Sequence, residues 1–278
     1  MQKQKSNAAH VSQSSQKELS SSQRQLWLIR HGERADESDE FDSWARTVHS
    51  ERWFDPPLTK TGALQAQGRG ELLSEHLKGH EKLHNQFWSR VVYVSPCERT
   101  LHTAFEIAKE LVRSNEEEGF GVTLAVRPGL GECASAVRKT GLCSTLDEEL
   151  CLKPVFFDNK WFPSRFLKKK EILERFNVSP FNGKTCKIRW QFTYDHTSVR
   201  ENFSQCVDNI MKENYKYKIA ICVTHREGIR CLDDRLFRAR VPYCALVKYL
   251  HHPQQSSHQS HYSNAHVARK QAFEFLTE

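Results

Sequence analysis

Short runs of β-branched and other apolar residues alternate along the chain with longer segments in which apolar residues recur every three or four positions. The first pattern is typical of buried strands and the second of amphipathic helices. The runs predict strands at residues 25–29, 90–94, 122–126, 218–223 and 245–249. The helical spacing predicts helices over Gly62–Leu77, with Leu64, Leu72, Leu73 and Leu77 inward, over Glu98–Leu111, and around Val199, Phe203, Cys206 and Ile210.

The order of these elements predicts the fold class. Strands that alternate with helices predict an α/β fold, here a three-layer α/β/α sandwich with a mainly parallel central sheet. In such a sheet, ligands bind beyond the carboxyl ends of the strands. The residues that directly follow the predicted strands are therefore the first candidates for a functional site.

Polar tails flank this pattern. Residues 1–24 include seven Ser and five Gln and predict a disordered leader, and residues 251–278 form a polar, His-rich tail. We expect one folded domain over residues 25–250. Within it, residues 133–197 are expected to form an insertion or cap near the active-site mouth, because residues 153–190 combine ten Lys or Arg and eight Phe or Trp with three Asp or Glu. A solvated surface with its own small core explains this composition equally well.

Composition narrows the classes of function. The net charge is +7, but the excess is diffuse outside residues 153–190 and no nucleic-acid motif is present, so we expect no nucleic-acid partner. No apolar run approaches the ~18 residues of a membrane span, and the N-terminus has no apolar signal segment, so neither a membrane nor a secretory route is expected. The nine Cys are scattered without a Cys-x-x-Cys pair, which argues against a disulfide framework or a zinc ribbon and favours a reducing, cytoplasmic location.

Three of the predicted strands end in Arg or His. Arg30, His31 and Arg34 follow the first strand, Arg99 follows the second, and His225 follows the fourth. No carboxylate cluster balances these groups in our interpretation of the sequence. Guanidinium groups match the oxygens of a phosphoryl group in bidentate fashion. The strand ends therefore predict a cationic pocket for a phosphorylated ligand.

The segment Arg30–Glu33 resembles the RHG[E] signature of the histidine phosphatase (phosphoglycerate mutase-like) superfamily. Three further segments support the resemblance. Residues 57–66 (PLTKTGALQA) resemble the PLTxxGxxQA motif, residues 95–104 (SPCERTLHTA) resemble SPxxRxxxTA, and residues 223–225 (VTH) resemble the strand end with the second histidine. A single RHG triplet is weak evidence, but four motifs in the family order are specific.

One branch of the superfamily is most similar. Residues 30–36 (RHGERAD), 55–59 (DPPLT) and 127–132 (RPGLGE) resemble the Sts-type phosphatases, which are related to ecdysteroid-phosphate phosphatase. Arg127 and Cys133 depart from that branch, which usually has Glu and Trp there, and this leaves the substrate open.

The resemblance implies a metal-independent phosphomonoesterase that needs no cofactor and forms a phosphohistidine. Its substrate is a phosphorylated small molecule or a phosphoprotein, for example one with phosphotyrosine, and a homodimer is possible. Two alternatives remain. One is a phosphoglycerate-mutase-like phosphotransferase, which uses the same histidine, and the other is a catalytically weak module that binds phosphorylated ligands.

The resemblance also implies a role for each site residue. The catalytic residues are His31 as nucleophile, Glu132 as general acid and base, and His225. The substrate-binding residues are Arg30, Arg34 and Arg99, which together with His225 hold the phosphoryl oxygens. Glu33 and Glu98 are alternative acids.

Overall fold

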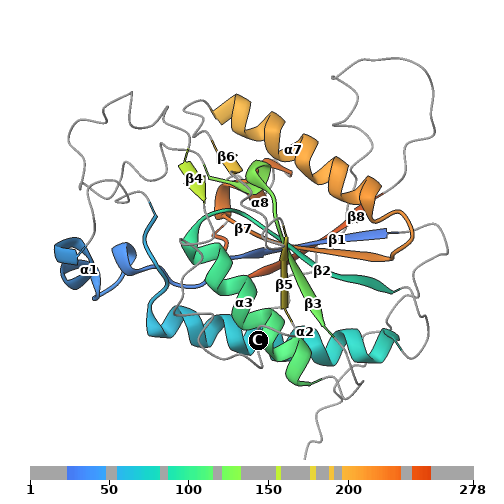
Figure 1. Cartoon of the computed structure of the whole chain (residues 1–278), viewed down its shortest axis with the longest axis horizontal. Helices are drawn as coiled ribbons and strands as arrows, with labels where there is room; N and C mark the ends of the chain where they lie inside the picture. Colours follow the sequence, from blue (N-terminus) through green and yellow to red (C-terminus); the bar gives the residue numbers. More distant parts are fainter. Residues whose placement is uncertain are drawn as a thin grey trace, which may run out of the picture.

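A six-stranded sheet forms the centre of the computed structural model (Figure 1), in the order β5-β3-β2-β7-β1-β8. β8 is antiparallel to β1, and all other neighbouring strands are parallel. This confirms the mainly parallel sheet. The strands are β1 (Arg24–Arg30), β2 (Trp88–Val94), β3 (Val122–Val126), β5 (Phe176–Ser179), β7 (Ile219–Thr224) and β8 (Leu246–His251).

The structure describes only part of the chain. The described residues are 24–47, 55–81, 87–114, 121–132, 155–157, 176–179, 188–190, 196–232 and 240–251. The predicted leader up to residue 23, the tail beyond residue 251 and most of the predicted insertion lie outside them, so the predictions for these segments stay predictions.

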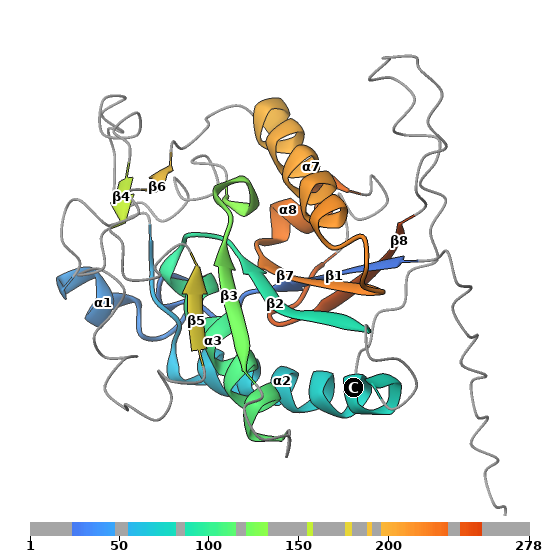
Figure 2. The ribbon, with the colours of Figure 1, turned by 45° about the vertical axis from the view of Figure 1, so that its right-hand side comes forward.

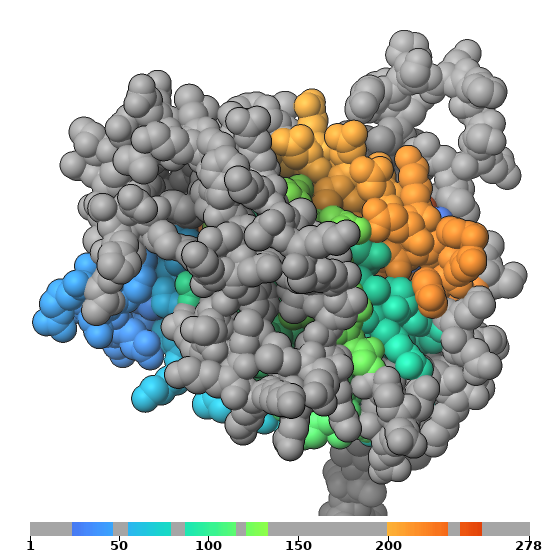
Figure 3. All heavy atoms as spheres, viewed as in Figure 1, coloured from blue at the N-terminus to red at the C-terminus, as the bar shows by residue number. Residues whose placement is uncertain are grey.

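Helices cover both faces of the sheet, which confirms the three-layer sandwich (Figures 1 and 2). α2 (Lys60–Glu81) and α3 (Glu98–Arg113) lie on one face, and α7 (His196–Glu213) and α8 (Arg226–Cys231) lie on the other. The remaining elements are α1 (Phe41–Thr47), the 3-10 turns η1 (Ala35–Glu37) and η2 (Pro128–Leu130), and the antiparallel pair β4 (Val155–Phe157) and β6 (Ile188–Trp190). Figure 3 shows α1 (blue) and α7 (orange) at opposite sides of one face of the molecule.

The alternation of side chains along the strands explains why the apolar runs are continuous. In β1, Trp27 and Ile29 point into the core beneath α2 and α3, whereas Leu26 and Leu28 point into the core beneath α7 and α8. A strand with both faces covered needs apolar residues at every position, whereas a half-exposed strand alternates apolar with polar residues. The same arrangement holds in β7, where all six residues are buried.

The predicted inward face of α2 is wrong for two residues. Leu64 and Leu72 are exposed, at 68% and 40%, whereas Leu73 and Leu77 are buried as predicted. The buried stripe instead passes through Gly70, where an added Cβ would lie 2.8 Å from the Glu110 Cβ of α3. Because the two helices approach so closely at this glycine, small residues rather than the larger leucines set the direction of the helix.

The sequence did not predict β5, which lies within residues 133–197 and extends the sheet beside β3. Among the described residues, no helix is long and apolar enough to cross a membrane.

Candidate active site

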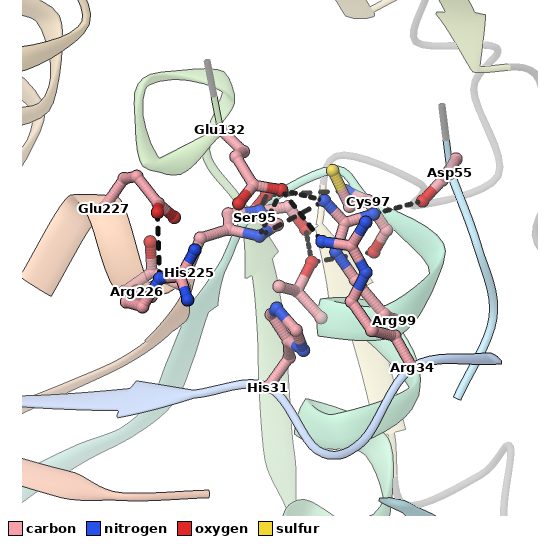
Figure 4. Close-up of polar contacts among 12 residues, drawn as sticks. His31, Arg34, Asp55, Ser95, Cys97, Arg99, Glu132, His225, Arg226 and Glu227 are labelled. Carbon is pink, nitrogen blue, oxygen red and sulfur yellow. Dashed lines mark hydrogen bonds and ion pairs between the residues drawn. The ribbon is translucent and has the colours of Figure 1, made fainter. Parts of the chain in front are cut away.

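The candidate site lies at the carboxyl ends of β1, β2, β3 and β7, where backbone hydrogen bonds join the loops that follow the strands. The His31 N–H donates to the Thr224 carbonyl over 3.0 Å, and the Ser95 N–H donates to the Val223 carbonyl over 3.1 Å. These bonds bring the two predicted histidines together, with 5.3 Å between the ring centroids of His31 and His225. All six predicted site residues are buried around this point, and Figure 4 shows five of them.

The loop after β1 packs against the start of α2 through two glycines. A Cβ on Gly32 would lie 2.3 Å from the Gly62 carbonyl oxygen, and a Cβ on Gly62 would lie 2.2 Å from the Glu33 carbonyl oxygen. Neither space admits a side chain. The hydroxyl of Thr59 accepts the Gly62 N–H over 2.9 Å and so caps α2. The RHG and PLTxxG motifs are therefore two halves of one contact.

α3 fixes the same loop from the other side. The Gly32 N–H donates to the hydroxyl of Thr103 over 3.0 Å, and that hydroxyl donates to the Arg99 carbonyl over 2.8 Å. This explains the Thr in the SPxxRxxxTA pattern, because it joins the histidine loop to the helix turn that holds Arg99.

The ring of His31 has a defined tautomer. Its Nδ1 lies 2.7 Å from the Gly32 carbonyl oxygen, which can only accept a hydrogen bond, so Nδ1 holds the proton and Nε2 holds the lone pair. Burial, together with the neighbouring charges of Arg99 and Arg30 and with His225, lowers the pKa of His31 well below 6.5. The imidazole is therefore neutral at neutral pH, which is the form a nucleophile needs.

Arg99 is fully buried and joins two carboxylates. Its Nη1 lies 3.2 Å from Asp55 Oδ1, and its Nη2 donates to Glu132 Oε2. Asp55 also accepts the Glu98 N–H at the start of α3, over 2.9 Å. The expectation that no carboxylates balance the strand-end cations is therefore wrong. Asp55 and Glu132 lie 44 and 33 residues from Arg99 in the sequence.

Arg34 and Arg30 have different surroundings. Arg34 forms a bidentate pair with Asp36, and its Nη1 lies 3.9 Å from Glu132 Oε2. Arg30 donates to the Val241 carbonyl over 2.7 Å, and its guanidinium lies 3.9 Å from the centroid of the Tyr243 ring. The ring of Tyr243 is also 5.8 Å from that of His31.

Glu132 reaches the site because η2 is tied to the end of β7. The Thr224 hydroxyl donates to the Leu130 carbonyl over 2.9 Å, and Glu132 follows two residues later. Glu132 Oε2 lies 3.4 Å from Nδ1 of His225, whose Nε2 lies 2.8 Å from the Ser95 hydroxyl. The structure therefore brings Glu132 to both predicted partners of the phosphoryl group, Arg99 and His225.

The charges of this part of the site follow from burial and from the arginines. Burial lowers the pKa of His225 to about 3, against the effect of Glu132, so the ring is neutral at neutral pH. Burial alone would raise the pKa of Glu132, but the electrostatic effects of His225, Arg99 and Arg34 hold it well below 4.5. Because His225 is neutral, the two guanidinium groups are the cations that keep Glu132 ionised at neutral pH.

The alternative acids have other surroundings. Glu33 accepts a hydrogen bond from the Thr59 hydroxyl over 2.8 Å, a structural contact. Glu98 begins α3. Sequence reasoning missed five neighbours of the site, although three of them lie inside quoted motifs or strand ends: Asp36, Asp55, Ser95, Glu227 and Tyr243.

The described residues contain no group of three or more His, Cys, Asp or Glu side chains placed to hold a metal ion. The arrangement instead offers a neutral imidazole nitrogen beside three buried guanidinium groups, with a carboxylate across from it. Such a set can bind a phosphoryl dianion and accept it on nitrogen.

Residues 26–135 match the family described as the histidine phosphatase superfamily, branch 1. This match confirms the resemblance found in the motifs. A comparison with curated proteins found no match.

Solved structures similar to this chain include the ecdysone phosphate phosphatase of Bombyx mori, with 19% identity, a TM-score of 0.45, and coverage of 87% of this chain and 99% of that one. Another is a mycobacterial glucosyl-3-phosphoglycerate phosphatase, with 11% identity, a TM-score of 0.45, and coverage of 83% and 91%. Identities this low say nothing about a shared substrate.

Proposed function

We propose that this protein is a metal-independent phosphomonoesterase that acts through a phosphohistidine on His31. The observation that supports this most directly is the hydrogen bond from Nδ1 of His31 to the Gly32 carbonyl, which leaves Nε2 free of a proton in a buried, cation-lined site. A second observation agrees with it. The Nε donors of Arg30 and Arg99 are buried and have no hydrogen-bond partner among the described residues. Buried donors in a folded protein usually have a partner, and phosphoryl oxygens can fill that role.

In the first step, Nε2 of His31 attacks phosphorus in line with the leaving oxygen. The N–P bond forms as the P–O bond to the leaving group breaks, and charge spreads over the three remaining oxygens. Arg30, Arg99 and His225 bind these oxygens, and Arg34 adds a fourth contact. Groups already fixed in a buried site stabilise this charge without reorganising at the moment of reaction.

Glu132 exchanges protons on the far side of the phosphoryl group. It protonates the leaving oxygen in the first step and takes a proton from water in the second, as water attacks phosphorus and releases inorganic phosphate from His31. The carboxylate lies against Arg99 and near Arg34 before substrate binds. A dianionic phosphate that binds the same arginines weakens their hold on Glu132, so that the carboxyl can accept a proton.

Cys97 is the other nucleophilic side chain of the site loop. Burial raises the pKa of its thiol to about 12, so it is protonated at neutral pH and is a poor nucleophile. The substrate class that fits the proposal is a phosphate monoester of a small molecule or of phosphotyrosine.

The test is to trap the intermediate. Wild-type protein quenched in base after mixing with labelled phosphate monoester should hold base-stable, acid-labile phosphate, and His31→Ala should hold none. The matched control is His102→Ala, which removes an imidazole from the outer side of α3, where it pairs with Glu106 at 3.7 Å. Label on Cys97 or on a hydroxyl residue would overturn the proposal.

Two further measurements separate the alternatives. Transfer of the phosphoryl group to an acceptor, with no release of inorganic phosphate, would favour the mutase-like phosphotransferase. Binding of phosphorylated ligands with no turnover would favour the binding module. Activity should persist in excess EDTA, and vanadate should inhibit as a mimic of the transferred group.

A further inference from the structure

A second carboxyl group lies beside Glu132. It belongs to Glu227, in the first turn of α8 and two residues after His225. Its Oε1 accepts a hydrogen bond from Nε of Arg226 over 2.9 Å, and its Oε2 is buried. Figure 4 shows Glu227 reaching from α8 toward the segment that holds Glu132. The phosphomonoesterase mechanism has so far given this group no role.

The carboxyl groups of Glu132 and Glu227 hydrogen-bond to each other. An ionised carboxylate only accepts hydrogen bonds, so this contact requires a proton on one of the two. No N–H or hydroxyl of the described residues donates to Glu227 Oε2. The pair therefore holds one proton and one negative charge, as close carboxyl pairs do.

The charges around Glu132 show which of the two is ionised. Glu132 Oε2 accepts a hydrogen bond from Arg99, lies 3.9 Å from Nη1 of Arg34 and 3.4 Å from Nδ1 of His225. Two buried guanidinium groups therefore stabilise the carboxylate form of this residue. The negative charge of the pair belongs on Glu132.

The surroundings of Glu227 favour the protonated form. The charged groups that face it are Arg226 and Arg230 of α8, Arg30 at the end of β1, and Glu132. Among the described residues, Arg226 alone forms an ion pair with it, and the side chain of Arg226 is 33% exposed, so solvent screens that pair. Burial and the neighbouring charge and hydrogen bond of Glu132 raise the pKa of Glu227.

We propose that Glu227 holds the proton that Glu132 delivers to the leaving oxygen, which makes the two residues a carboxyl–carboxylate relay. The inference rests on the proposed phosphomonoesterase function and adds a residue to it. Glu227 acts through Glu132 and not on the substrate, so it is a positioning residue for the transferred proton. It resolves a conflict in the site, because the arginines that bind phosphate also keep Glu132 without the proton that an acid needs.

The proton balance closes over one turnover. In the first step Nε2 of His31 bonds to phosphorus as the P–O bond to the leaving group breaks, and Glu132 passes the proton of Glu227 to the leaving oxygen. Both carboxyl groups are then ionised. In the second step water attacks phosphorus and the N–P bond breaks, while the water proton passes to Glu132 and on to Glu227. One water is consumed, and one alcohol and one inorganic phosphate are released.

The test uses the leaving group as a reporter of proton transfer. An alkoxide needs a proton to leave, whereas p-nitrophenolate leaves almost unaided. In single-turnover measurements at neutral pH, Glu227→Gln should slow the phosphorylation of His31 by an alkyl phosphate on the order of 10²-fold, with little change for p-nitrophenyl phosphate. Glu132→Gln should show the same selectivity.

Glu110→Gln is the matched control, because it neutralises another buried carboxyl, paired with Arg113 on α3 and outside the site. It should change neither rate. Equal slowing of both substrates by Glu227→Gln would show a structural role and overturn the relay.

The pH profile supplies a second readout. In wild type the pair keeps its proton up to the raised pKa of Glu227, so the alkyl phosphate rate should hold to a higher pH than in Glu227→Gln. In Glu227→Gln the only acid is Glu132, whose pKa is low, so the rate should fall from a lower pH as the pH rises. Glu227→Asp retains a carboxyl and should restore part of the wild-type profile. An unchanged profile in Glu227→Gln would overturn the relay.

A measurement without turnover separates this inference from the proposed function. Carboxyl ¹³C NMR of the wild-type protein should show the side chain of Glu227 titrating above the ordinary range of glutamate, assigned by its loss in Glu227→Gln or, if that variant does not fold, by through-bond connection to its backbone. A Glu227 carboxyl that is already ionised at pH 5 would overturn the relay whatever the enzyme does. Failure to trap a phosphohistidine would instead overturn the proposed function.

Discussion

The two sides of the candidate site are held together by different forces. We name the two sides by their proposed roles. The nucleophile side is the His31 loop after β1, which packs against α2 and α3. The acid side is the pair of Glu132, after η2, and Glu227 of α8. On the nucleophile side the contacts run through backbone groups and glycines, with Gly32 pressed against Gly62 and the His31 N–H bonded to the Thr224 carbonyl. On the acid side they run between charged side chains.

This difference determines how each side responds to a ligand. Contacts between backbone groups do not depend on protonation, so the nucleophile is in place before substrate arrives. The contacts of Glu132 with Arg99 and Arg34 are ionic, so an incoming phosphate competes with them directly. In the proposed mechanism the nucleophile side is therefore preorganised, whereas the acid side changes its charge state as the substrate binds.

The largest effect is expected from Arg99→Ala, because this residue joins the two sides. The variant leaves the carboxylates of Asp55 and Glu132 buried without their guanidinium partner, which typically costs about 3–5 kcal/mol in the free energy of unfolding. Denaturant unfolding at neutral pH measures this. Turnover should also be lost, since a phosphate-binding donor is gone.

The cost of Arg99→Ala should shrink in acid. In wild type the pKa of Glu132 is depressed, so its ion pair stabilises the fold above the ordinary glutamate pKa and the benefit disappears as the pH falls through the folded-state value. Wild type and variant should therefore converge toward low pH. A difference that is independent of pH would mean that lost packing, and not the ion pair, links the two sides.

Gly32→Ala tests the backbone contacts of the nucleophile side. The added Cβ would lie 2.3 Å from the Gly62 carbonyl oxygen, so the loop and the start of α2 must separate, at a cost of roughly 1–3 kcal/mol. Gly68→Ala is the matched control within α2, because an added Cβ there meets nothing within 4 Å. It should stabilise the protein by roughly 0.5–1 kcal/mol through helix propensity. Thermal melts of both variants measure the contrast, and equal shifts would contradict the contact.

Much of the nucleophile side could be predicted from the sequence, and the reason is physical. Short sequence patterns indicate its residues: a glycine that permits close approach, a threonine that caps α2, and Arg30 and His31 at the end of an apolar run. The strands and the layers could be predicted in the same way, since both follow from short-range periodicity.

The acid side depends on approaches between distant segments. The pairing of Asp55 with Arg99 spans 44 residues, and that of Glu132 with Arg99 spans 33. No local pattern specifies which carboxylate meets which arginine, so the sequence predicted Glu132 through family resemblance alone and left out Asp55 and Glu227. The wrong orientation of Leu64 has a similar cause, because packing at Gly70 overrode the pattern of large apolar residues.

A smaller effect is expected from Thr59→Ala. The hydroxyl caps α2 by accepting the Gly62 N–H and also donates to Glu33. Loss of such a cap typically costs about 1 kcal/mol. Thr59→Ser keeps the hydroxyl and should retain most of the stability in denaturant unfolding. If Ser and Ala destabilise equally, the methyl group and not the cap holds the nucleophile side at this position.

The prediction with the smallest expected effect concerns the protonation state of His31, and it separates the two sides most sharply. The pKa of His31 is lowered well below 6.5, first by burial and then by the charge of Arg99, so the imidazole should remain neutral as the pH falls from 8 through 6.5. A lowered pKa means that the proton binds only at a more acidic pH, so the nucleophile stays available throughout this range. Ring NMR signals of His31 should accordingly show no titration there.

The rate of phosphohistidine formation should agree with the NMR signals of His31. With p-nitrophenyl phosphate, which needs little help from an acid, the single-turnover formation of phosphohistidine should show no loss centred on pH 6.5. The unfolded chain does bind a proton at His31 near that pH, so this residue lowers the stability of the fold as the pH falls below 6.5, even while its chemistry is unaffected. A His31 ring that titrates near 6.5 would mean that charge, and not burial and backbone contacts, sets the state of the nucleophile, and the contrast between the two sides would not hold.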